Sequence, residues 1–235
     1  MAVSIVLVHG AWHGAWCWDP VVDILTERGQ PVVALDLPGH GADTAPLTDL
    51  HGHGDAVRTA LDALDTPAIL VGHSYGGAAI TDAGTHDAVR HLVYISAFPI
   101  DTHETMIVND ATGGDENALQ RAIRVDGDTL TIDPDAAVDA FFHDCDEADA
   151  ARAVAQLTAE RMDGFGQSPR VAAWRERPST YAVCTDDRAV TPALQRDLAA
   201  RCTTTVEWPT SHSPFLSQPA LVADCLIELA RSTAQ

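Results

Sequence analysis

Lysine is absent from this chain of 235 residues, so arginine supplies all 14 of its basic residues. Acidic residues number 34, which gives a formal net charge of −20 at pH 7. A surface with so few positive charges repels the phosphates of nucleic acids and the anionic headgroups of lipids. We therefore expect neither a nucleic-acid partner nor a membrane partner, and we interpret the acidic surface as a solvated coat.

Long apolar runs are also missing, since none approaches the roughly 20 residues of a membrane-spanning helix. Residues 1–8 carry neither a basic leader nor a cleavage site, and their composition is that of a strand. The cysteines are odd in number and scattered, with no Cys-x-x-Cys pair, which is typical of reduced thiols rather than of a disulfide framework. Together these absences predict a cytoplasmic protein.

Short β-branched runs alternate with longer amphipathic stretches through much of the chain. The runs are nearly continuous in apolar residues, as expected of parallel strands covered on both faces. They lie at 3–8, 31–36, 67–72, 91–96, 180–184 and 204–208. Helices are expected at about 18–28, 53–64, 75–86, 192–201 and 218–231. This alternation predicts an α/β fold with about six mostly parallel strands and helices on both faces of the sheet.

One segment, 99–174, interrupts this alternation. A connection of that length inside a compact domain is usually functional. We therefore predict a core made of residues 1–98 and 175–235, with 99–174 inserted as a cap, or lid, over the carboxyl edge of the sheet. The alternative is an ordinary connection that carries surface helices.

Within this segment the pattern predicts a hairpin followed by two helices. The expected strands, 121–125 and 129–132, flank Asp126-Gly127-Asp128, which is typical of a tight turn. The expected helices lie near 134–143 and 146–161.

A Gly-x-Ser-x-Gly motif, Gly72-His73-Ser74-Tyr75-Gly76, follows the third expected strand and precedes a helix. A sharp turn between strand and helix lifts the Ser74 hydroxyl above the sheet edge. The flanking glycines are needed because a side chain there would collide with neighbouring backbone. We therefore predict that Ser74 is a catalytic nucleophile.

An anionic tetrahedral intermediate needs two N–H donors at about 3 Å. We assign one donor to the backbone of Tyr75, directly after the nucleophile. The other is assigned to Ala11, in the turn at the end of the first strand. His9 and His13 in that region suggest a metal site as an alternative, but we favour a role for His9 in orienting the loop, with no metal bound.

A serine hydroxyl needs a positioned base, and the base needs an acid that fixes its tautomer. Among the 11 histidines, His212 follows the last strand and precedes the last helix, so it lies at the same sheet edge as Ser74. Asp186 and Asp187 compete for the role of the acid after the strand at 180–184. The pattern Asp-x-x-Val before a helix-starting proline favours Asp187, and the order Ser, Asp, His is that of the α/β-hydrolase fold.

With these residues placed, the chain resembles the α/β-hydrolases of the plant methylesterase and hydroxynitrile lyase group, with their bacterial esterase relatives. The similarity covers most of the core and is weaker in 99–174, which shapes the substrate pocket in that family. The matching stretches are His9-Gly10-Ala11-Trp12-His13-Gly14-Ala15-Trp16, Ala34-Leu35-Asp36-Leu37-Pro38-Gly39-His40-Gly41, Gly72-His73-Ser74-Tyr75-Gly76-Gly77, Val183-Cys184-Thr185-Asp186-Asp187-Arg188 and Ser211-His212-Ser213.

The resemblance implies one of two chemistries. The family's cyanohydrin lyases place a lysine after the catalytic histidine and a threonine near the oxyanion turn, where this chain has Ser213 and Gly10. The esterase pattern is the better match, and it implies a small-molecule ester substrate, no metal and no organic cofactor. Besides Gly10, the residues expected to bind substrate are Trp12, Phe98 and Trp174.

Other functions stay open at this stage. A lyase or a C–C bond hydrolase would use the same site, and a binding receptor of the same fold would retain the triad without turnover. The sequence names neither the ester nor the oligomeric state, for which we expect a monomer or a homodimer.

Overall fold

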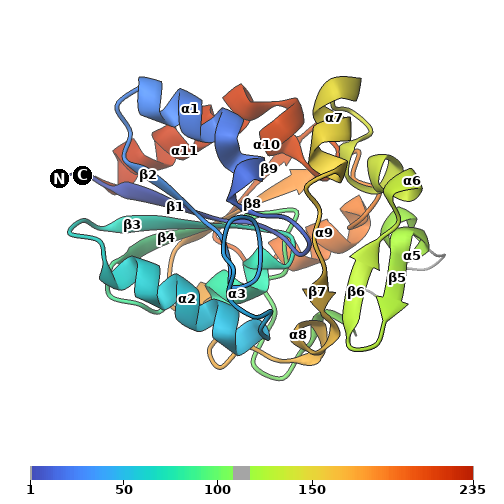
Figure 1. Cartoon of the computed structure of the whole chain (residues 1–235). Coiled ribbons are helices and arrows are strands. Elements are labelled where there is room, and N and C mark those ends of the chain that lie inside the picture. Colours follow the sequence, from blue (N-terminus) through green and yellow to red (C-terminus); the bar gives the residue numbers. More distant parts are fainter. Residues whose placement is uncertain (1, 108–116, 235) are drawn as a thin grey trace.

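The computed structural model describes residues 2–107 and 117–234, and its centre is a sheet of six parallel strands (Figure 1). The strands are β1 (Ser4–Val8), β2 (Val32–Leu35), β3 (Ala68–His73), β4 (Val89–Ile95), β8 (Ser179–Cys184) and β9 (Thr204–Trp208). Their order in the sheet is β2-β1-β3-β4-β8-β9, and each neighbouring pair is parallel. The predicted six-stranded α/β architecture is confirmed.

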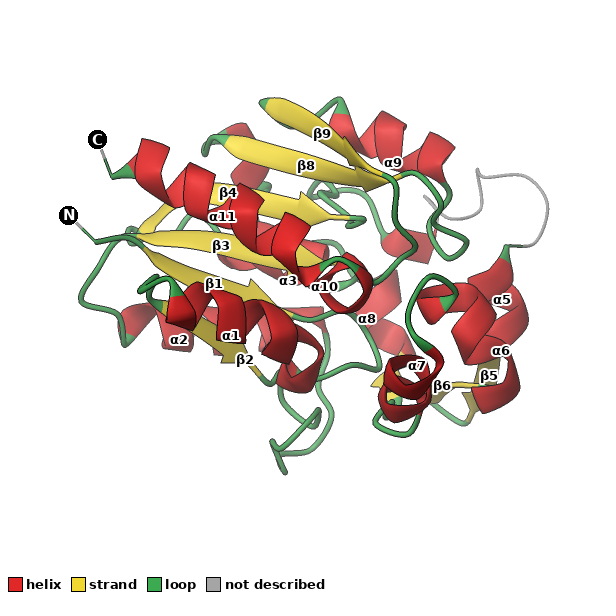
Figure 2. Cartoon of the chain, turned by 90° about the horizontal axis from the view of Figure 1, so that it is seen from above, coloured by secondary structure: helices red, strands yellow, loops and turns green. Residues whose placement is uncertain are grey.

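Helices lie on both faces of the sheet, and all five predicted helices are present (Figures 1 and 2). One face carries α1 (Asp19–Glu27) and α11 (Pro219–Thr233). The other carries α2 (Leu50–Asp62), α3 (Gly76–Ala83) and α9 (Pro192–Ala199). Shorter helical turns are η1 (Ala15–Trp18), η3 (Ala173–Arg175) and α10 (Pro214–Ser217).

Alternate residues of each strand enter different apolar cores, because successive side chains of a strand point to opposite faces. In β1, Ile5 and Leu7 belong to the core beneath α1 and α11. Val6 and Val8 belong to the core beneath α2, α3 and α9. All four side chains are buried, which explains why the strand sequence is apolar throughout rather than alternating.

The segment between β4 and β8 contains a second, smaller sheet. We call the described residues of 99–174 the insertion; residues 108–116 of the predicted cap lie outside the described residues. Its strands are β5 (Ile123–Asp126), β6 (Thr129–Ile132) and β7 (Glu160–Arg161), antiparallel and in that order. Its helices are α5 (Ala118–Ala122), α6 (Pro134–Ala137), the π-helical turn η2 (Val138–Phe142), α7 (Glu147–Val154) and α8 (Met162–Gly166). In Figure 2 this sheet lies beyond the carboxyl ends of the main strands, opposite the two chain termini.

Two local predictions in the insertion need correction. The helix expected at 146–161 ends at Val154, because Thr158 donates its backbone N–H across the molecule to the carbonyl of Trp12 (2.8 Å) instead of to the preceding helical turn. Residues 160–161 pair with β6 as a strand. The hairpin begins at Ile123 rather than 121, since the preceding residues belong to α5, whose start is capped by Asn117. The tight turn is present, with Gly127 at a φ of 62°.

The part of the chain that the structure describes contains no helix long and apolar enough to cross a membrane. The five cysteines all fall in that part, and each is a free thiol.

Candidate active site

Ser74 lies directly after β3, on the turn into α3 at the carboxyl edge of the sheet. Its φ is 49°, a left-handed conformation that side-chain-bearing residues rarely adopt. A Cβ at Gly72 would lie 2.6 Å from the carbonyl oxygen of Gly76, and one at Gly76 would lie 2.4 Å from that of His9. Both glycines are therefore required for the tight turn that exposes Ser74 to the edge.

His212 and Asp187 meet at the same edge, in the loops that follow β9 and β8. His212 Nδ1 lies 2.7 Å from Asp187 Oδ2, and both side chains are buried. The other carboxylate oxygen, Oδ1, accepts the backbone N–H groups of Ala189 (2.7 Å) and Val190 (2.9 Å). The competing Asp186 is exposed, so the geometry favours Asp187 as the partner of His212.

Two more side chains hold the Asp187 carboxylate, and the sequence did not single out either of them. Ser96, at the end of β4, donates from Oγ to Asp187 Oδ2 at 2.5 Å and lies 3.2 Å from His212 Nδ1. Gln195 donates from Nε2 to the same carboxylate oxygen at 3.0 Å. Ser96 also has a left-handed backbone, with a φ of 43°. Its position as the last residue of the strand predicted at 91–96, at the carboxyl edge, is the one signal that points to it.

The turn of Ser74 and the loop of His212 are joined by His73. The rings of His73 and His212 lie 4.5 Å apart, and His73 Nε2 donates to the backbone carbonyl of His212 at 2.9 Å. Burial, followed by the neighbouring His212, lowers the pKa of His73 well below its usual value, so its imidazole is neutral. Within the described residues the Ser74 hydroxyl makes no hydrogen bond of its own; catalytic hydrogen bonds are often long before substrate binds.

Both predicted oxyanion donors border the cavity in front of Ser74. Ala11 and Tyr75 line this cavity together with Ser74. Within residues 2–107 and 117–234, neither backbone N–H donates to another group. Two free N–H groups beside a nucleophile are the arrangement that stabilises an oxyanion.

Two buried histidines orient the Ala11 peptide. The carbonyl of Gly10 accepts His9 Nδ1 at 2.8 Å and the backbone N–H of His13 at 3.3 Å. His9 Nε2 accepts the N–H of Leu37, so the hydrogen of this imidazole lies on Nδ1. Burial lowers the pKa of His9 well below its usual value, which keeps the ring neutral. Because the C=O and N–H of a trans peptide point in opposite directions, fixing the Gly10 carbonyl also fixes the Ala11 N–H.

The cavity at Ser74 has a volume of about 330 Å³ and a mostly apolar wall. Two of the predicted substrate-binding residues, Trp12 and Phe98, line it. The insertion contributes much of the wall of this cavity, and the sequence did not predict those positions. The described residues that line the cavity are Ala11, Trp12, Ser74, Tyr75, Phe98, Met106, Ile107, Leu119, Gln120, Ile123, Leu130, Met162, Phe165, Ala189 and Val190.

The other two predicted substrate-binding residues do not line the cavity. Trp174 donates its indole N–H to the carbonyl of Ile100 at 3.3 Å, and the guanidinium of Arg175 lies 4.7 Å from its ring. These contacts hold Trp174 beside Ile100 and Arg175, so its substrate-binding role stays a prediction that the cavity at Ser74 does not support. Gly10 lies behind the nucleophile, where an added Cβ would come within 3.0 Å of the Cβ of Ser74.

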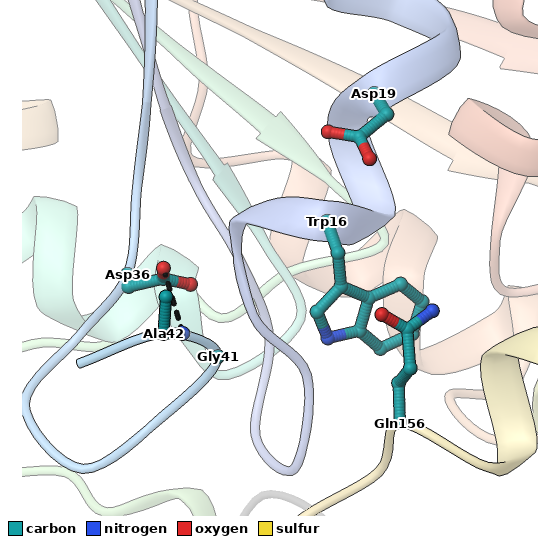
Figure 3. Close-up of a pocket in the computed structure, with 6 residues that line it drawn as sticks. All are labelled: Trp16, Asp19, Asp36, Gly41, Ala42 and Gln156. Carbon is teal, nitrogen blue, oxygen red and sulfur yellow. Dashed lines mark hydrogen bonds between the residues drawn. The ribbon is translucent and has the colours of Figure 1, made fainter. Parts of the chain in front are cut away.

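A second hollow, of about 530 Å³, lies away from Ser74 and is shown in Figure 3. Its lining residues are Trp16, Asp19, Asp36, Gly41, Ala42 and Gln156. Asp36 accepts the backbone N–H groups of Ala42 (3.0 Å, dashed in Figure 3) and Ala15 (2.6 Å), so its carboxylate joins two loops. No predicted catalytic residue lines this hollow. The described residues contain no group of three or more His, Cys, Asp or Glu side chains arranged to hold a metal.

Comparison with known proteins identifies the family. The sequence pattern of the family described as "Alpha/beta hydrolase family" matches residues 5–225. The chain belongs to the α/β-hydrolase family. A pyrethroid hydrolase of Sphingobium wenxiniae is 29% identical over 99% of this α/β-hydrolase and 89% of that protein. Methylesterase 2 of Arabidopsis thaliana is 27% identical over 96% of this chain and 95% of its own length.

A solved structure gives the same result. The crystal structure of a pyrethroid hydrolase from Sphingobium faniae superimposes on this α/β-hydrolase with a TM-score of 0.86 at 27% identity. The match covers 100% of this chain and 99% of the other. The predicted fold and the resemblance to the methylesterase group with its bacterial relatives are confirmed.

Proposed function

We propose that this α/β-hydrolase is a serine esterase that cleaves carboxylic esters of small, largely apolar molecules through an acyl-enzyme. One observation carries the proposal: Ser74 borders a cavity of about 330 Å³ beside two unbonded backbone N–H groups, with the Asp187–His212 pair at the same sheet edge. The names of the relatives, a pyrethroid hydrolase and a methylesterase, agree with ester hydrolysis.

The proposed mechanism assigns one role to each group. His212 takes the hydroxyl proton of Ser74 while its Nδ1–H donates to Asp187. Ser74 Oγ bonds to the ester carbonyl carbon, and the electron pair of the C=O bond moves onto oxygen, where the N–H groups of Ala11 and Tyr75 stabilise it. When the intermediate collapses, His212 protonates the leaving alkoxide. Water then repeats the sequence on the acyl-enzyme, with no metal or organic cofactor involved.

The walls of the cavity support a neutral, apolar substrate. Among the described residues, none that lines it carries a charge. Binding an ionised acyl or alcohol group there would desolvate a charge without a partner, which is costly. The net charge of −20 adds a general repulsion of anionic esters. The insertion supplies Leu130, Met162 and Phe165 to the wall, so we propose that it acts as the cap of the site.

The test is the Ser74→Ala variant, compared with Ser232→Ala in the exposed last turns of α11. We expect Ser74→Ala to lower turnover of a nitrophenyl ester by about 10⁴-fold or more with an unchanged thermal melt, and Ser232→Ala to behave as the unaltered chain does. A fluorophosphonate probe should label the unaltered chain at Ser74 alone. Unchanged turnover in Ser74→Ala would reject the esterase. Reversible ligand binding without labelling would favour a receptor.

A further inference from the structure

We propose that Trp12 is a positioning residue through which the insertion holds the oxyanion turn in its working shape. The inference rests on the proposed esterase function, because it assigns a role in stabilising the ester oxyanion. It differs from a role in the pocket wall, in which Trp12 would only contact bound substrate.

The backbone of Trp12 is strained and needs support. Its φ is 65°, in the left-handed region, although tryptophan has a large side chain. Such conformations persist only where the surrounding structure holds them, and they cluster at functional sites. Trp12 lies between Ala11, the proposed donor, and His13, whose N–H donates to the Gly10 carbonyl of the donor's peptide, so a relaxation at Trp12 would shift that hydrogen bond and with it the Ala11 N–H.

The support comes from the insertion, through hydrogen bonds to the indole and to the backbone carbonyl of the residue. The indole Nε1 of Trp12 donates to the carbonyl of Leu130 in β6 at 2.9 Å. The backbone carbonyl of Trp12 accepts the N–H of Thr158, just before β7, at 2.8 Å. Both bonds are shielded, since Trp12 is only 3% exposed.

Aromatic packing fixes the ring between these bonds. The ring of Trp12 is stacked on Phe165, with centroids 5.6 Å apart, and on Phe141, with centroids 6.1 Å apart. Phe141 also lies 5.5 Å from the ring of His212. The insertion thus contacts both the oxyanion turn and the proposed base through one aromatic cluster.

This geometry separates the two roles of Trp12 experimentally. Loss of a wall residue weakens the binding of every ligand that fills the cavity. Misplacement of an N–H donor weakens only the states in which the carbonyl oxygen carries negative charge. Trp12→Phe keeps an aromatic ring and removes the indole N–H that reaches Leu130. Trp16→Phe is the matched control, because the Trp16 indole N–H has no partner among the described residues and Trp16 does not line the cavity.

The experiment compares two ligands and one short ester. A trifluoromethyl ketone adds the Ser74 oxygen to its carbonyl carbon, the C=O electron pair becomes an oxyanion, and the proton passes to His212. The corresponding secondary alcohol fills the same space without reacting. For Trp12→Phe we expect kcat on nitrophenyl acetate and affinity for the ketone to fall about 10- to 100-fold, with affinity for the alcohol within about 3-fold. Trp16→Phe should change none of these by more than about 3-fold.

A second pair of variants cuts the other hydrogen bond without touching the cavity. Thr158→Pro removes both the N–H and the hydroxyl that donate to the carbonyl of Trp12, whereas Thr158→Ala removes only the longer hydroxyl bond (3.4 Å) and retains the N–H. The same loss of ketone affinity is expected for Thr158→Pro only. Thermal melts monitor folding of each variant.

If Trp12→Phe lost affinity for the ketone and for the alcohol equally, Trp12 would act only as a residue of the cavity wall, and the inference would be overturned. The inference would also be overturned if Trp12→Phe gave the same kcat and the same ketone affinity as Trp16→Phe. Absence of turnover and of Ser74 labelling in the unaltered chain would instead count against the proposed function, so the two failures are distinguishable.

Discussion

The buried ion pair between His40 and Glu160 fastens the insertion to the core, and its removal makes a quantitative prediction. His40 Nε2 lies 3.1 Å from Glu160 Oε2, and the two side chains are 0% and 1% exposed. His40 Nδ1 is 3.2 Å from the carbonyl of Pro38 and donates to it, so both ring nitrogens face acceptors, which favours the charged imidazolium. Breaking a buried pair by removing one partner leaves an uncompensated charge. Glu160→Gln should therefore lower the free energy of unfolding by about 3 kcal/mol at pH 5.5.

The loss should depend on pH, with a sign set by the pKa of His40. Burial by itself would lower this pKa, but the adjacent Glu160 carboxylate, together with the Pro38 carbonyl and the charge of Asp36, outweighs burial and raises the pKa above its usual value. A group with a raised pKa contributes stability that is complete below its unfolded pKa of about 6.5 and disappears as pH rises through the folded pKa. The difference between the unaltered chain and Glu160→Gln should therefore be largest at acid pH and shrink above neutrality.

Thermal and urea unfolding between pH 5 and 9 measure this difference. For a chain of this length, 3 kcal/mol corresponds to a fall of about 6–12 °C in Tm. Asp62→Asn is the matched control, since Asp62 pairs with His86 at 2.9 Å but is 74% exposed. Exposed pairs of this kind contribute about 1 kcal/mol or less. A loss below about 1 kcal/mol for Glu160→Gln at pH 5.5, or one that grows as pH rises, would refute the reasoning.

Two further predictions concern the site itself. Ser96→Ala removes a 2.5 Å hydrogen bond to Asp187. We expect it to lower kcat on a nitrophenyl ester about 10-fold with little change in KM. An unchanged kcat would exclude a role for Ser96 in holding the carboxylate. Met162→Trp places a larger side chain in the wall of the cavity and should lower kcat/KM for bulky esters at least about 10-fold more than for acetyl esters, as measured over a panel of acyl lengths. Equal effects on long and short esters would place the substrate elsewhere.

Much of the site was predictable because parallel strands bring their carboxyl ends to one edge. The strands before Ser74 and Asp187 are buried throughout and largely apolar, so their limits can be read from composition, whereas the strand before His212 contains Thr204, Thr205 and Glu207 and is partly exposed. A polar residue just past such a strand must lie at that edge. The same rule applies to Ser96, which follows β4, but no motif distinguishes this serine from an ordinary loop residue.

The insertion was less predictable, because its local patterns are weak and its contacts are distant. The helix expected to continue past Val154 ends there, as Thr158 forms a hydrogen bond to Trp12 that helix periodicity does not encode. Trp174 is a large aromatic residue of the kind that often lines an apolar pocket, but its indole N–H donates to the carbonyl of Ile100.

The sequence by itself determined the parallel sheet, the nucleophile turn at Ser74 and the loops that carry Asp187 and His212. These depend on local composition, on glycines that permit close backbone approach, and on the common direction of the strands. Only the tertiary structure decided that the indole of Trp12 reaches Leu130, that Glu160 meets His40, and which side chains enclose the cavity. Those contacts join segments more than a hundred residues apart, and they form only where the packing of the insertion on the core brings the two surfaces together.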